Sequence, residues 1–137
     1  MKVSIIGMGY VGLSNAVLLS LKNNVVCHDI DTSKLDCINK RISPIKDSLI
    51  SSYFKNKKLR LTTSEYINKE MSNSDFIIIS TPTDFDVQKK TFNTSSIYVI
   101  LKKLNSLKST AYIIIKSTLP IGYTKKVNSF YKKLKIY

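Results

Sequence analysis

The chain has 137 residues, of which 43% are hydrophobic and 23% charged, a composition typical of one soluble globular domain with a buried core. The longest apolar runs are far shorter than the roughly 20 residues that cross a bilayer, so we expect no membrane partner and a cytoplasmic location. The formal net charge of +13 is compatible with a nucleic-acid or membrane-surface partner. Because the lysines are spread along the chain and the densest basic cluster contains no interleaved aromatic residues, we expect solvated helix faces and no nucleic-acid binding.

In chain order, the predicted elements are a strand at 2–6, a helix at 11–22, a strand at 24–29, a helix at 32–41, a short helix at 47–55, a strand at 59–62, a weak helix at 64–71, a strand at 75–80, a polar loop at 81–93, a helix at 95–107, a strand at 112–116 and a helix at 121–134. Residues 135–137 look like the approach to a further strand. This alternation predicts an α/β fold: a Rossmann-type doubly wound parallel sheet, in one domain spanning residues 1–137 and truncated before its last strand or strands.

Two finer expectations concern the helices. Thr32 or Ser33 is the predicted cap of the helix at 32–41, because short hydroxyl side chains satisfy the free N–H groups of a first turn. In the last helix, the apolar period predicts one inward face. That face consists of Tyr123, Val127, Phe130, Tyr131 and Leu134.

Two cysteines and one histidine are the side chains that a metal or thiol site would use first. Neither Cys27 nor Cys37 has the spacing of a metal ligand, and both are expected to be free thiols in a reducing compartment. Cys27 falls in an apolar run, which favours a buried position, and Asp29 has a better claim to function than its neighbour His28. We therefore predict no metal site.

Three glycines separate the first predicted strand from the first helix and form the pattern G-x-G-x-x-G, with Tyr10 and Val11 inside it. Gly7 would allow the tight turn, Gly9 would let a pyrophosphate approach the backbone, and Gly12 would let the helix pack closely. The start of the helix then offers free N–H groups and a partial positive charge to phosphates. Such a pattern is weak when it stands alone, but its place between strand and helix predicts a dinucleotide-binding loop.

An acidic residue, Asp29, closes the second predicted strand. In dinucleotide-binding folds, a carboxylate at this place accepts hydrogen bonds from the hydroxyls of the adenine ribose and repels a 2′-phosphate. No arginine follows nearby, so NAD is favoured over NADP. The alternatives are a plain strand-to-helix turn for the glycines and a strand-end cap for Asp29.

Five strings of the sequence resemble, in order and in spacing, the UDP-glucose/GDP-mannose dehydrogenase family. They are residues 1–13 (MKVSIIGMGYVGL), 41–45 (RISPI), 80–86 (STPTDFD), 92–96 (FNTSS) and 116–122 (KSTLPIG). The strings at 41–45 and 80–86 look most like the UDP-glucose branch. The resemblance covers nearly all of the chain and implies the NAD-binding domain of a nucleotide-sugar 6-dehydrogenase.

The resemblance also implies roles for three residues outside the glycine loop. Thr83 and Thr118 would line the nicotinamide end of the cofactor cleft, with Thr118 near the reacting carbon, where it would help to hold a catalytic water. Lys34 would lie beside the adenine ribose. The alternatives are a strand exit for Thr83 and a helix cap for Thr118. Both threonines follow predicted parallel strands, and ligands bind at that edge of such sheets.

The family reaction oxidises the sugar C6 alcohol to a carboxylate with two NAD, through a covalent cysteine intermediate. Cys27 and Cys37 match neither that cysteine nor its partners, so the resemblance implies that this chain alone is not catalytically competent. The substrate it implies is UDP-glucose, with UDP-N-acetyl sugars and GDP-mannose as alternatives. A truncated NAD-binding module without turnover is a further alternative, and the parent enzyme is expected to be a homodimer.

Overall fold

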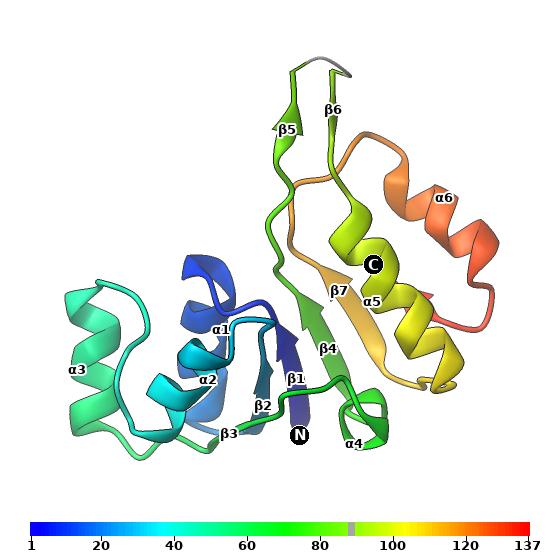
Figure 1. The fold of residues 1–137 in the computed structure, drawn as a ribbon. Helices are drawn as coiled ribbons and strands as arrows, with labels where there is room; N and C mark the ends of the chain where they lie inside the picture. The colour runs from blue at the N-terminus through cyan, green and yellow to red at the C-terminus, as the bar shows by residue number, and fades with distance from the viewer. Residues whose placement is uncertain (88–89) are drawn as a thin grey trace.

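The computed structural model of the chain describes residues 1–87 and 90–137. Its main element is a six-stranded parallel sheet in the order β3-β2-β1-β4-β7-β8 (Figure 1). The strands are, across the sheet, β3 (Leu61–Thr63), β2 (Asn24–His28), β1 (Lys2–Ile6), β4 (Phe76–Ile79), β7 (Tyr112–Ile115) and β8 (Lys135–Ile136). This order reverses between β1 and β4, as in the Rossmann fold, and confirms the predicted fold class.

Helices cover both faces of the sheet and bury two apolar clusters. The helices are α1 (Tyr10–Ser20), α2 (Thr32–Asn39), α3 (Ser48–Asn56), α4 (Lys69–Ser72), α5 (Ser95–Ser106) and α6 (Tyr123–Phe130). One cluster joins α1, α2 and α3 to the β3-β2-β1 half, around Ile5, Leu13 and Leu35. The other joins α4, α5 and α6 to the β4-β7-β8 half, around Ile77 and Leu101. A helix layer on each face makes the sheet doubly wound.

The chain end predicted to approach a further strand forms one. Lys135 and Ile136 pair in parallel with Tyr112 and Ile113, so β8 occupies the sixth position of the sheet. Directly after it, Tyr137 makes two backbone hydrogen bonds to β7: its N–H donates to Ile113 O, and its O accepts from Ile115 N–H. The edge of the β4-β7 half is therefore covered over this short stretch.

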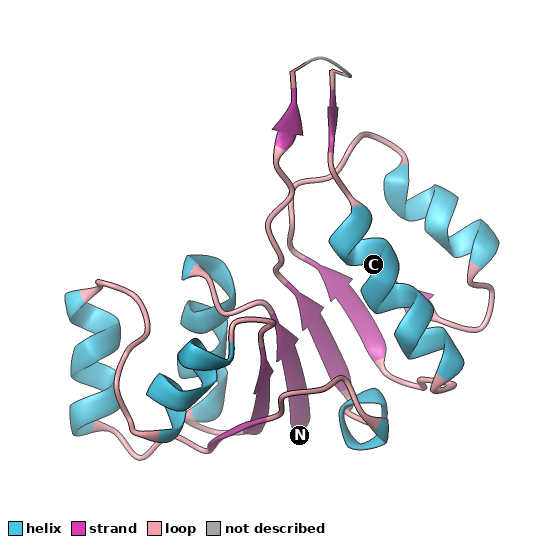
Figure 2. Ribbon diagram, in the orientation of Figure 1, coloured by secondary structure: helices cyan, strands magenta, loops and turns pink. Residues whose placement is uncertain are grey.

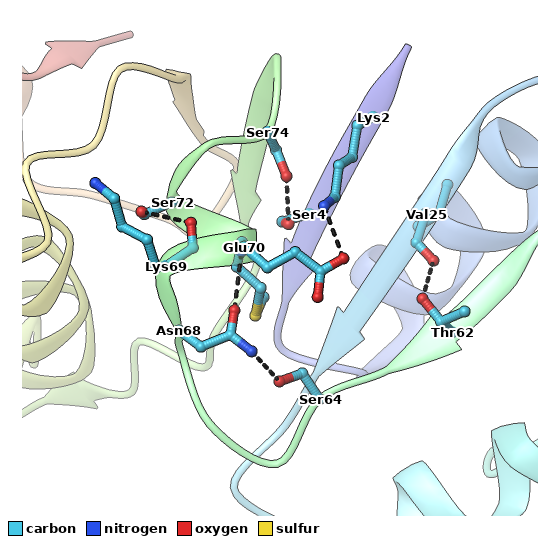
Figure 3. Close-up of polar contacts among 11 residues, drawn as sticks. Lys2, Ser4, Val25, Thr62, Ser64, Asn68, Lys69, Glu70, Ser72 and Ser74 are labelled. Carbon is cyan, nitrogen blue, oxygen red and sulfur yellow. Dashed lines mark hydrogen bonds and ion pairs between the residues drawn. The ribbon is translucent and has the colours of Figure 1, made fainter.

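The helix predicted at 64–71 is much shorter than expected, because local side-chain hydrogen bonds replace its first half; Figure 3 shows the one that joins Asn68 to Ser64. Ser64 Oγ donates to Tyr66 O at 2.7 Å and accepts from Asn68 Nδ2 at 3.2 Å. Asn68 Oδ1 in turn accepts from Met71 N–H, so α4 begins only at Lys69. Local side-chain bonds of Ser and Asn compete with helix formation in this way.

Two predicted helix details were wrong. The cap of α2 is Asp31, whose carboxylate accepts from Ser33 N–H, rather than Thr32 or Ser33. In α6, the helix ends at Phe130, whose side chain is 72% exposed and lies outside the core. The other four predicted residues do face the core: Val127 and Leu134 are buried, and Tyr123 and Tyr131 are partly buried against the same cluster.

The segment 81–93, predicted as a loop, contains a short antiparallel hairpin. Its strands are β5 (Phe85–Asp86) and β6 (Thr91–Phe92), and the rings of Phe85 and Phe92 meet edge to face at 5.2 Å. The hairpin projects beyond the carboxyl ends of the sheet strands (Figure 2). A pairing of only two residues on each side leaves too little periodicity in the sequence to reveal it.

Candidate functional site

A cleft of about 880 Å³ lies at the carboxyl ends of β1, β2, β4 and β7. It spans the point where the strand order reverses, which is where open α/β sheets bind ligands. The structure brings nearly all of the predicted site residues to this one cleft. Its lining includes Gly7, Gly9, Tyr10, Val11, Asp29, Lys34, Thr83 and Thr118. Gly12 is the predicted site residue outside the lining.

The three glycines of the loop meet three different geometric requirements. Gly7 has a φ of +98°, and a Cβ there would lie 2.6 Å from the carbonyl oxygen of Ser80. A Cβ on Gly12 would lie 1.8 Å from the carbonyl oxygen of Gly7, so α1 starts in direct contact with the loop. A Cβ on Gly9 would meet no atom within 4 Å. The first and third glycines are therefore needed by the protein itself, and the second leaves open space on the cleft side.

The amino end of α1 faces that open space without a side-chain cap. Gly9 is the N-cap residue and provides no side-chain acceptor. The first N–H groups of a helix have no partners within the helix and carry a partial positive charge. Together with the space at Gly9, they offer the free donors and the positive charge to which phosphate groups bind at helix starts.

Asp29 is held firmly at one end of the cleft, with 8% of its surface exposed. Its Oδ2 accepts from Met8 N–H at 2.6 Å and from Lys34 Nζ at 3.3 Å, and its Oδ1 accepts from Asp31 N–H at 2.9 Å. The carboxylate thus ties the glycine loop to the start of α2. Two carboxylate oxygens have about four acceptor positions, so Asp29 retains capacity to accept from a ribose hydroxyl.

Asp31 adds a second negative charge at this end of the cleft. A hydrogen bond from the Ser33 hydroxyl holds the pKa of the Asp31 carboxyl below its ordinary value. Asp31 lines the cleft together with Asp29 and Lys34. Two carboxylates against one ammonium disfavour a further phosphate at this end, in agreement with the predicted preference for NAD.

The other end of the cleft is formed where the chain leaves β4 and β7. Thr83 is partly buried and Thr118 is exposed, and both line the cleft. Hydroxyl groups connect the two segments: Ser117 Oγ donates to Thr81 O at 2.7 Å, and Thr81 Oγ1 lies 3.0 Å from Ser96 Oγ. These hydroxyls were not predicted as site residues. Thr81 and Ser117 directly follow predicted strands, which would have placed them at the ligand-binding edge of the sheet without revealing their bonds, whereas Ser96 lies in a predicted helix and gives no such signal.

Ser80, the last residue before this segment, is a further residue that the sequence analysis missed. Its Oγ is buried and has no hydrogen-bond partner in the described part of the chain. Its backbone contacts the glycine loop, since Ser80 N–H donates to Ile6 O at 2.8 Å and Ser80 O limits the space at Gly7. A buried hydroxyl without a partner costs about 1–3 kcal/mol, which marks this part of the cleft floor as incomplete without a ligand or water.

Neither thiol is placed for chemistry in the cleft. Burial raises the pKa of the Cys27 thiol to about 12, so it stays protonated at neutral pH. Cys37 is partly buried on α2, outside the cleft lining. Among residues 1–87 and 90–137, no three His, Cys, Asp or Glu side chains are grouped so as to hold a metal ion. In the same ranges, no helix combines the length and apolar character needed to cross a membrane.

A family model for the UDP-glucose/GDP-mannose dehydrogenase family, NAD binding domain, matches residues 1–136. The chain belongs to this family. It is 46% identical over 129 residues to a UDP-glucose 6-dehydrogenase of Campylobacter jejuni, covering 93% of this chain and 33% of the relative. It is 43% identical over 127 residues to a UDP-glucose 6-dehydrogenase of Streptococcus pneumoniae, covering 93% of this chain and 32% of the relative.

Among solved structures, a ternary complex of GDP-mannose dehydrogenase from Pseudomonas aeruginosa superposes with a TM-score of 0.83. The match has 20% identity and covers 99% of this chain and 35% of that one, and it supports the fold. The family match confirms the resemblance and identifies NAD as the cofactor of this domain. The chain spans about a third of the length of the curated relatives it matches.

Proposed function

We propose that the chain binds NAD along the cleft, with the adenosine beside Asp29 and Lys34. The pyrophosphate then lies on the glycine loop at Gly9, against the N–H groups of Tyr10 and Val11. The observation that carries this placement is the open space at Gly9 in front of an uncapped helix start. The nicotinamide end follows as the part of the cleft opposite Asp29, where Thr83 and Thr118 lie.

The proposed parent activity is that of a UDP-glucose 6-dehydrogenase, which forms UDP-glucuronate with two NAD. This is supported by the names of two curated relatives, from Campylobacter jejuni and Streptococcus pneumoniae, which are 46% and 43% identical to this chain. When bound, NAD supplies the hydride acceptor. At this end, the protein would hold the nicotinamide ring in one orientation. Thr118 would lie next to the proposed reaction centre. A dehydrogenase for a UDP-N-acetyl sugar or GDP-mannose is the alternative within the family.

We further propose that this chain on its own binds NAD without turning over substrate. Oxidation to a carboxylate through a covalent intermediate needs a thiolate nucleophile. Cys27 is buried with a raised thiol pKa, and Cys37 lies outside the cleft lining. We propose a cytoplasmic homodimer for the parent enzyme, which rests on the family resemblance and is tested by the mass of the parent protein in solution.

The proposal that this chain binds NAD without turning over substrate is tested by measuring NADH formation by the 137-residue chain with UDP-glucose and NAD. Each absent acid, base or nucleophile typically costs factors of about 10²–10⁴ in rate, and several act together, so we expect NADH formation at background. The parent enzyme under the same conditions is the positive control. NADH produced from UDP-glucose by this chain alone would show that the catalytic groups lie within it.

A further inference from the structure

The β4-β7 ladder ends at a defined point beside the nicotinamide end of the cleft. Its last backbone rung runs from Lys116 N–H to Ile79 O, at 2.8 Å. Rungs of this kind recur at every second residue in a parallel pair. The next two bonds of the ladder would join Thr81 N–H to Lys116 O and then Thr118 N–H to Thr81 O. In the described ranges of the chain, the backbone hydrogen bonds include neither, so the Thr118 rung is missing as well.

A side chain takes the place of that missing rung. Ser117 Oγ donates to Thr81 O at 2.7 Å, in a partly buried position. The hydroxyl thus satisfies the carbonyl that the Thr118 N–H would otherwise reach, while it keeps the two segments linked. Thr118 is left on the cleft side, where it is exposed and lines the cavity.

Two more hydroxyls fix Thr81 from its other side. Thr81 Oγ1 lies 3.0 Å from Ser96 Oγ, and Ser96 Oγ donates to Pro82 O at 3.3 Å. Since Ser96 donates to Pro82, Thr81 is the donor to Ser96, and all three hydroxyl protons have acceptors. The carbonyl of Thr81 is therefore bonded to Ser117, the residue before Thr118. The hydroxyl of Thr81 is bonded to Ser96, in the first turn of α5.

We propose that Ser117 is a positioning residue: its hydroxyl occupies the Thr81 carbonyl just beyond the end of the β4-β7 ladder and thereby keeps Thr118 turned toward the nicotinamide end of the cleft. This inference rests on the proposed placement of the nicotinamide between Thr83 and Thr118. In Ser117→Ala the carbonyl of Thr81 loses its hydroxyl partner, and the donor that the register of the ladder provides is Thr118 N–H. A bond from Thr118 N–H to Thr81 O then extends the ladder and draws Thr118 away from the cleft.

The test compares NAD with ADP-ribose, which lacks the nicotinamide ring. Calorimetric titrations of the 137-residue chain are made with the wild type, Ser117→Ala and Ser117→Thr. Loss of one hydrogen-bonded position typically costs a factor of about 2–10 in affinity. We expect Ser117→Ala to lose about that factor for NAD and to bind ADP-ribose as before. Ser117→Thr, which keeps the hydroxyl, should restore most of the NAD affinity.

Amide hydrogen exchange gives a second readout that does not depend on any ligand. The Thr118 amide should exchange quickly in the wild type and become protected in Ser117→Ala, because it enters the ladder. Ser106→Ala is the matched control, since Ser106 Oγ donates to Lys103 O at 2.7 Å at the far end of α5. It should change neither affinity nor the Thr118 exchange rate.

The outcomes separate this inference from the proposed function. Unchanged NAD affinity in Ser117→Ala, or an equal loss for NAD and ADP-ribose, overturns the positioning role while NAD binding stands. An unprotected Thr118 amide in that variant overturns the extended ladder. A wild-type chain that binds neither ligand contradicts the proposed function itself, and the positioning role with it.

Discussion

The two ends of the cleft differ in what fixes their shape. At the glycine loop, backbone atoms approach so closely that a single added Cβ would meet a carbonyl oxygen at 2.6 Å on Gly7 or at 1.8 Å on Gly12. At the opposite end, the segments that leave β4 and β7 are joined by serine and threonine hydroxyls, such as Ser117 Oγ on Thr81 O at 2.7 Å. One end is shaped by excluded volume and the other by hydrogen bonds.

This difference predicts how each end responds to change. Overlap with a backbone atom cannot be relieved by a rotamer, so a substitution at the loop acts on the whole fold or abolishes binding. A hydroxyl link is worth about 0.5–1.5 kcal/mol, so a substitution at the far end shifts affinity by a small factor. Ser117→Ala, described above, tests the hydroxyl-linked end, and the predictions below test the glycine-loop half, from the largest expected effect to the smallest.

Gly12→Ala should have the largest effect, because the new methyl group collides with the Gly7 carbonyl. Relief requires α1 to move away from the loop and the sheet, which we expect to cost more than about 3 kcal/mol of unfolding free energy. Urea denaturation measures this loss. If the variant were as stable as the wild type, the loop would tolerate a Cβ at this position. That result would contradict the claim that excluded volume fixes the shape of the glycine loop.

Gly9→Val should abolish NAD binding while leaving the fold intact. Gly9 has extended backbone angles that any residue adopts, with a φ of −82°, and its Cβ direction meets no protein atom. The valine side chain therefore occupies only the space proposed for the pyrophosphate, and we expect affinity to fall by about 100-fold or more. Thermal unfolding without ligand should match the wild type. Undiminished stabilisation by NAD in this variant would place the pyrophosphate elsewhere.

Asp29→Ala should weaken NAD by a factor of about 10–100, because hydrogen bonds to a charged group contribute about 1.5–3 kcal/mol. The same change removes the charge that repels a 2′-phosphate and frees Lys34. The difference in affinity between NAD and NADP should therefore become smaller. Asp36→Ala, which removes an equal charge from an exposed position on α2, is the matched control. Titration of both cofactors measures the effect. A variant that keeps the wild-type ratio would contradict the assignment of the ribose site to Asp29.

The smallest expected effect concerns the thiols and reports on the packing of the β1-β2 half. Burial raises the pKa of Cys27 to about 12, so this thiol stays protonated and shielded up to mildly alkaline pH. A thiol reagent should therefore modify Cys37 in the folded chain and Cys27 only after denaturation. Cys37→Ser serves as the control that reduces rapid labelling to background. Rapid labelling of Cys27 in that variant would show that the strands beside Asp29 open readily.

The contrast between the two ends also explains how far the sequence could predict the structure. The strand order, the glycine loop and Asp29 could be predicted, because each depends on a local pattern: buried apolar runs, a strand–glycine–helix sequence and an acid at a strand end. The hairpin at Phe85 pairs too few residues to leave a periodic pattern in the sequence. The cap of α2 could be any of three neighbouring polar residues, Asp31, Thr32 or Ser33, and the sequence does not show which side chain accepts the hydrogen bond.

The hydroxyl links at the end of the cleft opposite Asp29 could not be predicted from the chain alone. Ser96 and Ser117 lie far from Thr81 in sequence, and their bonds exist only once β4, β7 and α5 are packed side by side. Serine is common on surfaces, so the residue type carries little information without the tertiary contact. The family resemblance pointed to the neighbouring threonines, and the structure adds the bond from Ser117, the residue before Thr118, to Thr81.

The central claim is that the cleft of this chain is complete enough to bind NAD through the glycine loop and Asp29. Its most direct test is thermal unfolding of the purified 137-residue chain in rising concentrations of NAD and, in parallel, NADP. Ligand at about 100 times its dissociation constant stabilises the folded state by about 2.7 kcal/mol, so we expect a rise of several degrees with NAD and a much smaller one with NADP. Equal shifts with both cofactors, or none with NAD at millimolar concentration, would contradict the account.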